Sequence, residues 1–392
     1  MKRIEILTAL FLLSTVVTAQ QDIFTRRGLS SPEIHEDGTV TFRVQVPKAS
    51  EIAISGSWMA AEGLAPGVAM MEKENDSVWS FTTDPLKAEM YRYNLFVNGV
   101  RTLDPANAHA IRDVANLSNV FIVGDGQADL YRVNKVPHGT VTFRWYPSPT
   151  VDKTRRMAIY TPPGYENNQE DYPVLYLHHG IGGDEEAWLG SGRAAQIMDN
   201  LIARRLARPM IVVMPNGNVF QEASPGNGSR GFVQPTFMLP NTMDGKFEES
   251  FGDIQAFVES NYRTIAKKEG RAIAGLSMGG FHTANISLNY PNTFDYVGLF
   301  SSALGVRPMG DSTSEMYKNK DQKLKQQMEN GYKLYWMAIG DGDMEMLLKG
   351  NASFRKKMDG MGMNYEYLET GGGHTWDNWR SYLSIFTQKI FN

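Results

Sequence analysis

The sequence predicts two domains, an all-β sandwich followed by an α/β domain with a mostly parallel central sheet. Up to about residue 125, short alternating strands follow one another with no helical period between them. Beyond residue 139, apolar strands alternate with helical segments, which is typical of a parallel sheet with helices on both faces. The chain of 392 residues is also longer than one compact core usually supports.

Composition excludes several classes of protein. Hydrophobic residues make up 42% and charged residues 21%, which is ordinary for a globular protein and excludes a disordered or fibrous one. The net charge of -4 offers no basic surface for nucleic acid and no polybasic patch for a membrane. Cysteine is absent, so disulfides, thiolate metal sites and a cysteine nucleophile are excluded. We expect no cofactor.

Residues 1–19 have the pattern of a signal peptide. Lys2 and Arg3 precede an apolar run from Ile6 to Val17, and the small residues before Gln20 suit a cleavage site. The apolar run is shorter than the roughly 20 residues that a membrane-spanning helix needs. We therefore expect an exported protein, periplasmic or extracellular, without a membrane span.

Residues 21–125 are predicted to form the sandwich. Residues Gly38–Val46 alternate apolar and polar side chains with period two, and the same pattern continues at 52–54, 78–82 and 90–97. Asn98-Gly99 after the last of these predicts a hairpin, because both positions of the tight turn need a positive φ.

These residues resemble carbohydrate-binding module family 48, an immunoglobulin-like sandwich of the early-set type. The resemblance rests on Ser31–Ile34, Ser55–Trp58, Val78-Trp79 and Leu103–Asn107. In that family exposed aromatic side chains can stack on sugar rings, which makes Trp58 and Trp79 candidates for glycan contact. Core packing is the commoner role for such residues, and many modules of this kind only support the enzyme domain.

Residues 126–138, with Gly126 and Pro137 as breakers, are predicted as a linker, and 139–392 as the α/β domain. Its predicted strands are 173–177, 210–214, 271–275, 296–301 and 334–339. Its predicted helices are 192–206, 249–262, 279–289 and 377–390, the third ended by Pro291. A ligand site is expected beyond the carboxyl ends of these strands.

The motif Gly275-Leu276-Ser277-Met278-Gly279 marks a candidate nucleophile. It follows an apolar strand and opens a helix, which is the setting of the nucleophile elbow of an α/β-hydrolase. A serine hydroxyl needs a base to take its proton. His374, in a glycine-rich loop before the last helix, is the one histidine well downstream of Ser277. The acid must then lie between them, and both Asp341 and Asp343 follow the predicted strand 334–339.

Two backbone N–H groups are candidates for an oxyanion hole. Met278 follows the nucleophile directly, at the start of a helix. The second donor is expected in the loop His178–Gly183, at Ile181 or alternatively at Gly182. The tandem His178-His179 is not expected to bind a metal, because adjacent strand residues point to opposite faces.

The same motifs, in order, resemble carbohydrate esterase family 1, in the esterase D group of α/β-hydrolases. The resemblance spans 139–391 and rests on His179–Glu185, Met214–Asn218, Arg271–Gly280 and Gly373–Trp379. It implies that the acid is the aspartate of a Gly-x-x-Asp turn, which is Asp343. The family often has an aromatic residue or leucine after that aspartate, and Met344 departs from this pattern.

The resemblance also implies a substrate, a feruloyl or acetyl ester of xylan or xylo-oligosaccharides. Trp188, Phe232 and Trp376 are candidates for an aromatic slot, with Phe220, Phe237 and Met238 in the same long loop as Phe232. A feruloyl esterase is expected; an acetylxylan esterase, an enterochelin esterase holding its siderophore with Arg193 and Arg230, and a silent glycan-binding protein are the alternatives. The oligomeric state stays open.

Overall fold

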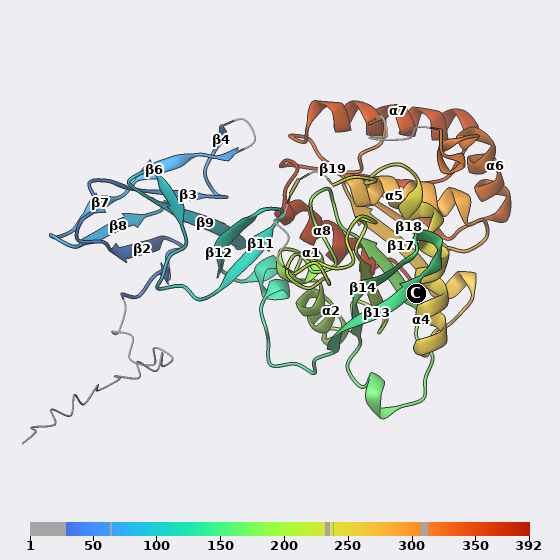
Figure 1. Ribbon diagram of the computed structural model, residues 1–392, viewed down its shortest axis with the longest axis horizontal. Coiled ribbons are helices and arrows are strands. Elements are labelled where there is room, and N and C mark those ends of the chain that lie inside the picture. The colour runs from blue at the N-terminus through green and yellow to red at the C-terminus, as the bar shows by residue number, and fades with distance from the viewer. Residues whose placement is uncertain (1–28, 63–64, 232–235, 238, 307–312) are drawn as a thin grey trace, which may run out of the picture.

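The computed structural model describes residues 29–392 except 63–64, 232–235, 238 and 307–312. A smaller all-β domain and a larger α/β domain lie side by side, as Figure 1 shows with the first in blue. The predicted signal peptide lies outside the described residues and stays a prediction. Among the described helices, none is long and apolar enough to cross a membrane.

The first domain is a sandwich of two antiparallel sheets. One sheet has the order β1 (Glu33–Ile34), β2 (Val40–Gln45), β8 (Val78–Thr82) and β7 (Glu72–Lys73). The other has the order β11 (Ala110–Asp113), β12 (Asn116–Val123), β9 (Glu89–Val97), β3 (Ile52–Gly56) and β6 (Val68–Met70). A small pair, β4 (Ala61–Glu62) and β5 (Ala65–Pro66), lies beside them.

Alternate residues of these strands fill the space between the two sheets. Phe42, Ile52 and Leu95 are buried there, as period two predicts. Trp58 stacks on Phe42 with ring centroids 5.4 Å apart, and Trp79 is 8% exposed. Trp79 therefore belongs to this core, and Trp58 is half-buried and packs against it, so neither forms a fully exposed platform for a sugar ring.

The turn at Asn98-Gly99 has the predicted form. Both residues have positive φ, and Val97 pairs with Val100 across the two-residue turn to strand β10 (Val100–Thr102).

The second domain is built on an eight-stranded sheet. The first two strands, β13 (Thr140–Ser148) and β14 (Lys153–Thr161), are antiparallel. The remaining strands run parallel, in the order β16 (Ile211–Pro215), β15 (Val174–His178), β17 (Arg271–Leu276), β18 (Tyr296–Phe300), β19 (Leu334–Gly340) and β20 (Glu366–Thr370). The mostly parallel sheet agrees with the predicted fold class.

Helices cover both faces of this sheet, and each face has its own buried core. On one face Leu175 and Leu177 pack with α2 (Ala194–Ala203) and α8 (Trp376–Thr387). On the other face Val174 and Tyr176 pack with helices from later in the chain, namely α4 (Phe251–Asn261), α5 (Met278–Asn289), α6 (Lys320–Asn330) and α7 (Glu345–Met361). Both sides of β15 are thus buried, as is typical of a parallel sheet.

The predicted linker 126–138 is partly helical and packs against the α/β domain. Its first half forms a 3-10 helix, η1 (Gly126–Tyr131), whose Leu130 and Tyr131 are buried in the core beside α2. His138 and Gly139 then both hydrogen-bond the carboxylate of Asp199 on α2. Apolar side chains in this stretch dock it onto the α/β domain, so it is a fixed connection.

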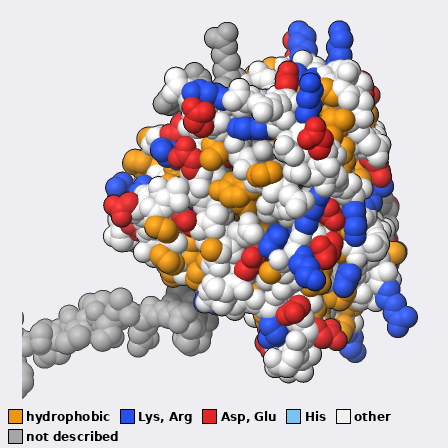
Figure 2. Space-filling model, turned by 90° about the vertical axis from the view of Figure 1, so that its right-hand side faces the viewer, with side chains coloured by type: hydrophobic (Ala, Val, Ile, Leu, Met, Phe, Trp, Pro, Cys, Tyr) orange, Lys and Arg blue, Asp and Glu red, His pale blue; other side chains and the backbone are white. Residues whose placement is uncertain are grey.

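The surface of the α/β domain carries mixed charge. Figure 2 shows acidic and basic side chains intermingled over the face that lies on the right of Figure 1. On this face, charges of both signs agree with the small net charge of -4.

Candidate active site

Ser277 stands in the turn between β17 and α5. Its φ is 52° and its ψ is -117°, a conformation that a non-glycine residue rarely adopts and that is typical of functional turns. Two close approaches require the flanking glycines. A Cβ on Gly275 would lie 2.4 Å from the Gly279 oxygen, and a Cβ on Gly279 would lie 2.5 Å from the His178 oxygen. The sharp turn lifts the serine hydroxyl above the sheet.

His374 connects Ser277 to Asp343. Its Nε2 lies 2.9 Å from Ser277 Oγ, and its Nδ1 lies 2.9 Å from Asp343 Oδ1. The carboxylate also accepts a bond from the backbone N–H of Met344, and its side chain is fully buried. The ring of Trp379 packs edge-on against the imidazole at 4.8 Å. The geometry is that of nucleophile, base and orienting acid.

The two candidate acids are separated by the structure. Asp343 turns inward to the imidazole, whereas Asp341, two residues earlier, is exposed. The roles of Ser277, His374 and Asp343 stay predictions until kinetics test them, but the structure brings the three side chains together.

The expected oxyanion donors lie beside the nucleophile. Met278 is the first residue of α5, so its N–H has no acceptor within the helix. Gly180 lies directly over the elbow, because a Cβ there would be 2.6 Å from Leu276 and 3.4 Å from the Cβ of Ser277. Ile181 and Ser277 line the same cavity. This arrangement is consistent with donors at Met278 and Ile181.

His179 fixes the loop that carries Ile181. Its Nδ1 donates to the carbonyl of Gly180 at 2.7 Å, and its Nε2 accepts from the N–H of Gly217 at 2.7 Å. Only the neutral ring can make both bonds, and burial lowers the pKa of His179 to about 4. His178 contacts the hydroxyl of Thr283, and burial holds its pKa well below the usual range. Among the described residues, no cluster of three or more metal-ligating side chains occurs.

A cavity of about 150 Å³ opens above Ser277 and His374. Its apolar walls come from Ile181, Leu276, Phe237, Trp376 and Trp379. Of the expected aromatic residues, Trp376 and Phe237 therefore line the site.

The other expected aromatic residues do not line this cavity or cannot be placed. Trp188 is 1% exposed, and its indole donates to the carbonyl of His178, so it supports the wall from behind. The prediction that Trp188 contacts the substrate is therefore wrong. Phe220 lines a different hollow, and Phe232 and Met238 lie outside the described residues.

Three further lining residues come from the sandwich domain, namely Arg92, Asp113 and Val114. Arg92 is ion-paired with Asp113, whose Oδ1 accepts a bond from the indole N–H of Trp376 at 3.2 Å. Sequence reasoning missed all three. The one signal is the polar alternation of Arg92 and Asn94 on β9, but that pattern does not reveal which surface the strand faces.

The family follows from comparison with known proteins. The family model Esterase, described as "Putative esterase", matches residues 148–388, well over half of the chain. The chain belongs to this esterase family. An "Endo-1,4-beta-xylanase/feruloyl esterase" of Xylanibacter ruminicola is 30% identical over 93% of this chain and 46% of its own length. The chain thus spans about half of that relative. An "Acetyl esterase" of Caldicellulosiruptor saccharolyticus is 27% identical over 55% of this chain and 82% of its own length.

Solved structures agree on the fold. A ferulic acid esterase that is 25% identical superposes with a TM-score of 0.52 over 64% of this chain and 97% of its own. A ferulic acid esterase from Anaeromyces mucronatus, solved with ferulic acid, is 24% identical, with a TM-score of 0.55 over 67% of this chain and 95% of its own. The α/β-hydrolase fold and the resemblance to carbohydrate esterase family 1 are confirmed. The likeness of the sandwich to family 48 modules stays a prediction.

Proposed function

We propose that the chain is an exported serine esterase that hydrolyses feruloyl esters of plant cell-wall xylan through an acyl-enzyme on Ser277. One observation carries the proposal: the Ser277–His374–Asp343 hydrogen-bonded chain lies at the floor of a cavity with aromatic walls. The Xylanibacter relative has feruloyl esterase in its name, which supports a feruloyl group as the acyl group.

The first half of the reaction transfers the acyl group. Ser277 Oγ attacks the ester carbonyl carbon while His374 Nε2 takes the hydroxyl proton. The carbonyl oxygen becomes negative and accepts hydrogen bonds from the N–H groups of Met278 and Ile181. The bond to the alcohol then breaks, and His374 gives the proton to the departing oxygen.

The second half releases the acid. Water attacks the acyl-enzyme while His374 takes one of its protons, and the proton returns to Ser277 Oγ as the ester bond breaks. Asp343 accepts the Nδ1–H of His374 throughout, which keeps Nε2 free as base and stabilises the charged ring.

The cavity walls suit a hydroxycinnamoyl ring. Phe237, Trp376 and Trp379 supply aromatic surface, and Ile181 and Leu276 add apolar contacts near the carbonyl position. Aromatic rings bury large apolar areas and favour stacked or edge contacts with another ring. An acetyl group is too small to use these walls.

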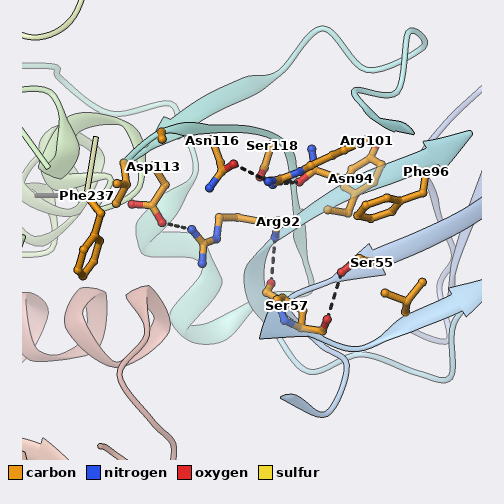
Figure 3. Close-up of a pocket in the computed structure, with 15 residues that line it drawn as sticks. Ser55, Ser57, Arg92, Asn94, Phe96, Arg101, Asp113, Asn116, Ser118 and Phe237 are labelled. Atoms are coloured by element: carbon orange, nitrogen blue, oxygen red, sulfur yellow. Dashed lines mark hydrogen bonds and ion pairs between the residues drawn. The ribbon is translucent and has the colours of Figure 1, made fainter. Parts of the chain in front are cut away.

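A second, larger hollow suits the alcohol side of the ester. It has a volume of about 520 Å³ and lies on the sandwich, sharing Arg92, Asp113, Val114 and Phe237 with the catalytic cavity. Figure 3 shows Arg92, Asn94 and Phe96 in a row along β9, flanked by serine and asparagine side chains. Hydroxyl, amide and guanidinium groups beside aromatic rings can hydrogen-bond and stack on a sugar.

Acetylxylan esterase remains the second candidate, because the Caldicellulosiruptor relative is named as an acetyl esterase. The enterochelin alternative has less support. Arg193 donates to the carbonyl of Tyr131, and Arg230 lies over the ring of Phe220 in another hollow. An enterobactin esterase from Shigella flexneri superposes over 89% of this chain at 14% identity and a TM-score of 0.59, which shows the fold alone. The assembled triad disfavours a silent binding protein.

The test is hydrolysis of methyl ferulate, 4-nitrophenyl acetate and acetylated xylan by residues 20–392, with Ser277→Ala as the matched control. The proposal predicts ferulate release that the control loses. Acetyl release without ferulate release would move the assignment to acetylxylan esterase. Activity on none of the three would contradict the esterase proposal for these substrates.

A further inference from the structure

The β11–β12 hairpin of the sandwich contacts both loops of the candidate active site. In Figure 1 it is the part of the sandwich nearest to α1 (Ala187–Gly190) and α8. Three consecutive residues at its end, Arg112, Asp113 and Val114, each reach a different residue of the α/β domain. We call these three residues the hairpin tip.

Two residues of the hairpin tip hold the loop that carries Ile181. Arg112 Nη2 lies 2.7 Å from Asp184 Oδ2, and the Asp184 side chain is 3% exposed. Val114 packs on Gly182 so closely that a Cβ on Gly182 would lie 2.6 Å from Val114 Cγ1. The ion pair and the apolar contact both hold the loop just after Ile181, from the sandwich side.

The third residue holds the loop that carries His374. Asp113 Oδ1 accepts the indole N–H of Trp376, two residues after His374. Trp376 packs edge-on against Trp379 at 5.1 Å, and Trp379 packs edge-on against the imidazole at 4.8 Å. Asp113 is itself held by its ion pair with Arg92 (Figure 3). A contiguous row of contacts therefore runs from the sandwich to the base.

The backbone of Val114 is strained. Its φ is 55°, which a β-branched residue adopts only where its surroundings enforce it. Such strain tends to occur at functional sites, because packing around them over-determines the conformation. At Val114 the strain places an isopropyl group between two domains and beside the cavity above Ser277.

We propose that the hairpin tip is a positioning element for ester hydrolysis. Arg112 and Val114 hold the donor N–H of Ile181, and Asp113 holds the imidazole of His374, at the spacing that the transition state requires. The sandwich domain thus sets the rate of acyl transfer even for an ester too small to reach the hollow on its surface. This inference rests on the proposed serine-esterase function but not on the identity of the acyl group.

The experiment uses the full mature chain with Val114→Gly, which relieves the backbone strain while removing the contact with Gly182. On 4-nitrophenyl acetate we expect kcat to fall about tenfold or more, since misplacement of catalytic groups has effects of this order. The loss in kcat should exceed any change in KM, because Val114 lines only one edge of the cavity but contacts the loop that carries Ile181. Val100→Gly, at a 68% exposed valine of the same domain, is the matched control and should keep the wild-type kcat.

A second pair of variants tests Asp113. Asp113→Ala removes the acceptor for Trp376 and should lower kcat, whereas Asp113→Asn keeps an acceptor oxygen and should restore most of it. A role limited to folding would not separate these two variants in kcat once both show cooperative unfolding. The pair also keeps the proposal testable if Val114→Gly does not fold.

The rate at which a fluorophosphonate probe phosphonylates Ser277 tests the same catalytic groups without an ester substrate. Ser277 Oγ forms a bond to phosphorus, the P–F bond breaks, fluoride leaves, and the hydroxyl proton passes to His374. We expect this rate to fall in parallel with kcat in Val114→Gly and Asp113→Ala. Wild-type rates in folded forms of both variants would overturn the inference.

The substrate proposal can fail separately. If the wild type releases no ferulate but cleaves 4-nitrophenyl acetate and reacts with the probe, the proposed feruloyl group is wrong. The variants of the hairpin tip then still test the positioning proposal. If the wild type neither cleaves the small ester nor reacts with the probe, both proposals are overturned.

Discussion

Asp343 and Asp341 share one turn after β19, but only Asp343 contacts the imidazole. We predict that Asp343→Asn lowers kcat by about 10³–10⁴-fold, because an amide no longer fixes the tautomer in which Nε2 is the base. Asp341→Asn, at an exposed side chain in the same turn, is the control and should leave kcat within about twofold. The measurement is steady-state kinetics on 4-nitrophenyl acetate.

Equal losses of kcat in Asp343→Asn and Asp341→Asn would contradict the assignment of Asp343 as the acid. So would a large loss in Asp341→Asn alone, which would move the acid to the alternative that the sequence left open.

His179 predicts a pH dependence of stability. Its pKa is lowered from 6.5 to about 4 in the folded protein, so the unfolded chain binds the proton first as the pH falls. The contribution of neutral His179 to the free energy of unfolding is therefore complete above pH 6.5, and it is lost progressively as the pH falls to about 4. At about 1.4 kcal/mol per pH unit, the loss amounts to about 3 kcal/mol in the free energy of unfolding.

Denaturant unfolding between pH 7 and 4 measures this loss, with His179→Gln as the comparison. The readout is the slope of the free energy of unfolding against pH, which does not depend on the starting stability of the variant, and we expect this slope to be shallower in His179→Gln. An unchanged slope would show that His179 is not the titrating group.

Single residues of the site could be predicted from local motifs. Ser277, His374 and the loop at Gly180 stand in short segments whose spacing reflects the chemistry directly. Asp343 needed the family resemblance, since spacing alone did not separate it from Asp341. Trp188 was misplaced because an aromatic near a motif can pack behind a wall as readily as in it.

At the level of elements, the close packing of α5 against the end of β15 makes a testable prediction. Gly279→Ala would place a Cβ 2.5 Å from two backbone oxygens, those of His178 and His179. These backbone atoms cannot move aside without disturbing the sheet, so we expect a loss of about 1–3 kcal/mol in the free energy of unfolding.

Gly360→Ala is the matched control for Gly279→Ala. Gly360 lies in α7 with no heavy atom within 4 Å of an added Cβ. Alanine should stabilise that helix by about 0.5–1 kcal/mol. Denaturant unfolding measures both, and an unchanged or raised stability of Gly279→Ala would contradict the packing argument.

Elements with a regular apolar pattern were predicted to within a few residues. The central strands are continuous apolar runs because both faces are buried. No strand was predicted at β13, where Phe143 and Trp145 are each 44% exposed, so the apolar side chains do not mark a core face. No helix was predicted at α6, where Leu324 and Met328 are the only apolar residues and the rest is polar.

At the level of the whole molecule, an ion pair between a buried arginine and a partly buried glutamate joins the two domains. Arg380 on α8 lies 2.8 Å from Glu89 on β9, and it also donates to the carbonyls of Ser191 and Met90. Burial raises the pKa of Glu89 in spite of the nearby guanidinium. Arg380→Ala would leave this carboxylate without its partner, so we predict a loss of about 3–5 kcal/mol in stability.

Lys389→Ala is the comparison for Arg380→Ala. Lys389 pairs with Glu366 at 2.7 Å, but both side chains are exposed, so the loss should be below about 1 kcal/mol. Denaturant unfolding measures the loss of stability in both variants. A small loss for Arg380→Ala would show that this pair does not hold the domains together.

The arrangement of the domains could not be predicted from local patterns. The sandwich was expected from period two, but nothing in residues 110–123 indicates that Asp113 and Val114 lie beside Ser277. Which surface of one domain meets another depends on shape and charge assembled from distant segments. The contribution of the sandwich to the site therefore became visible only in the folded molecule.

Trapping the acyl-enzyme shows whether Ser277 carries the acyl group. The chain would be mixed with methyl ferulate, quenched in acid within the first turnover, digested and analysed by mass spectrometry. We expect a feruloyl adduct on the peptide containing Ser277 and no such adduct in Ser277→Ala. Ferulate release that persists in Ser277→Ala, or an adduct on another residue, would contradict it.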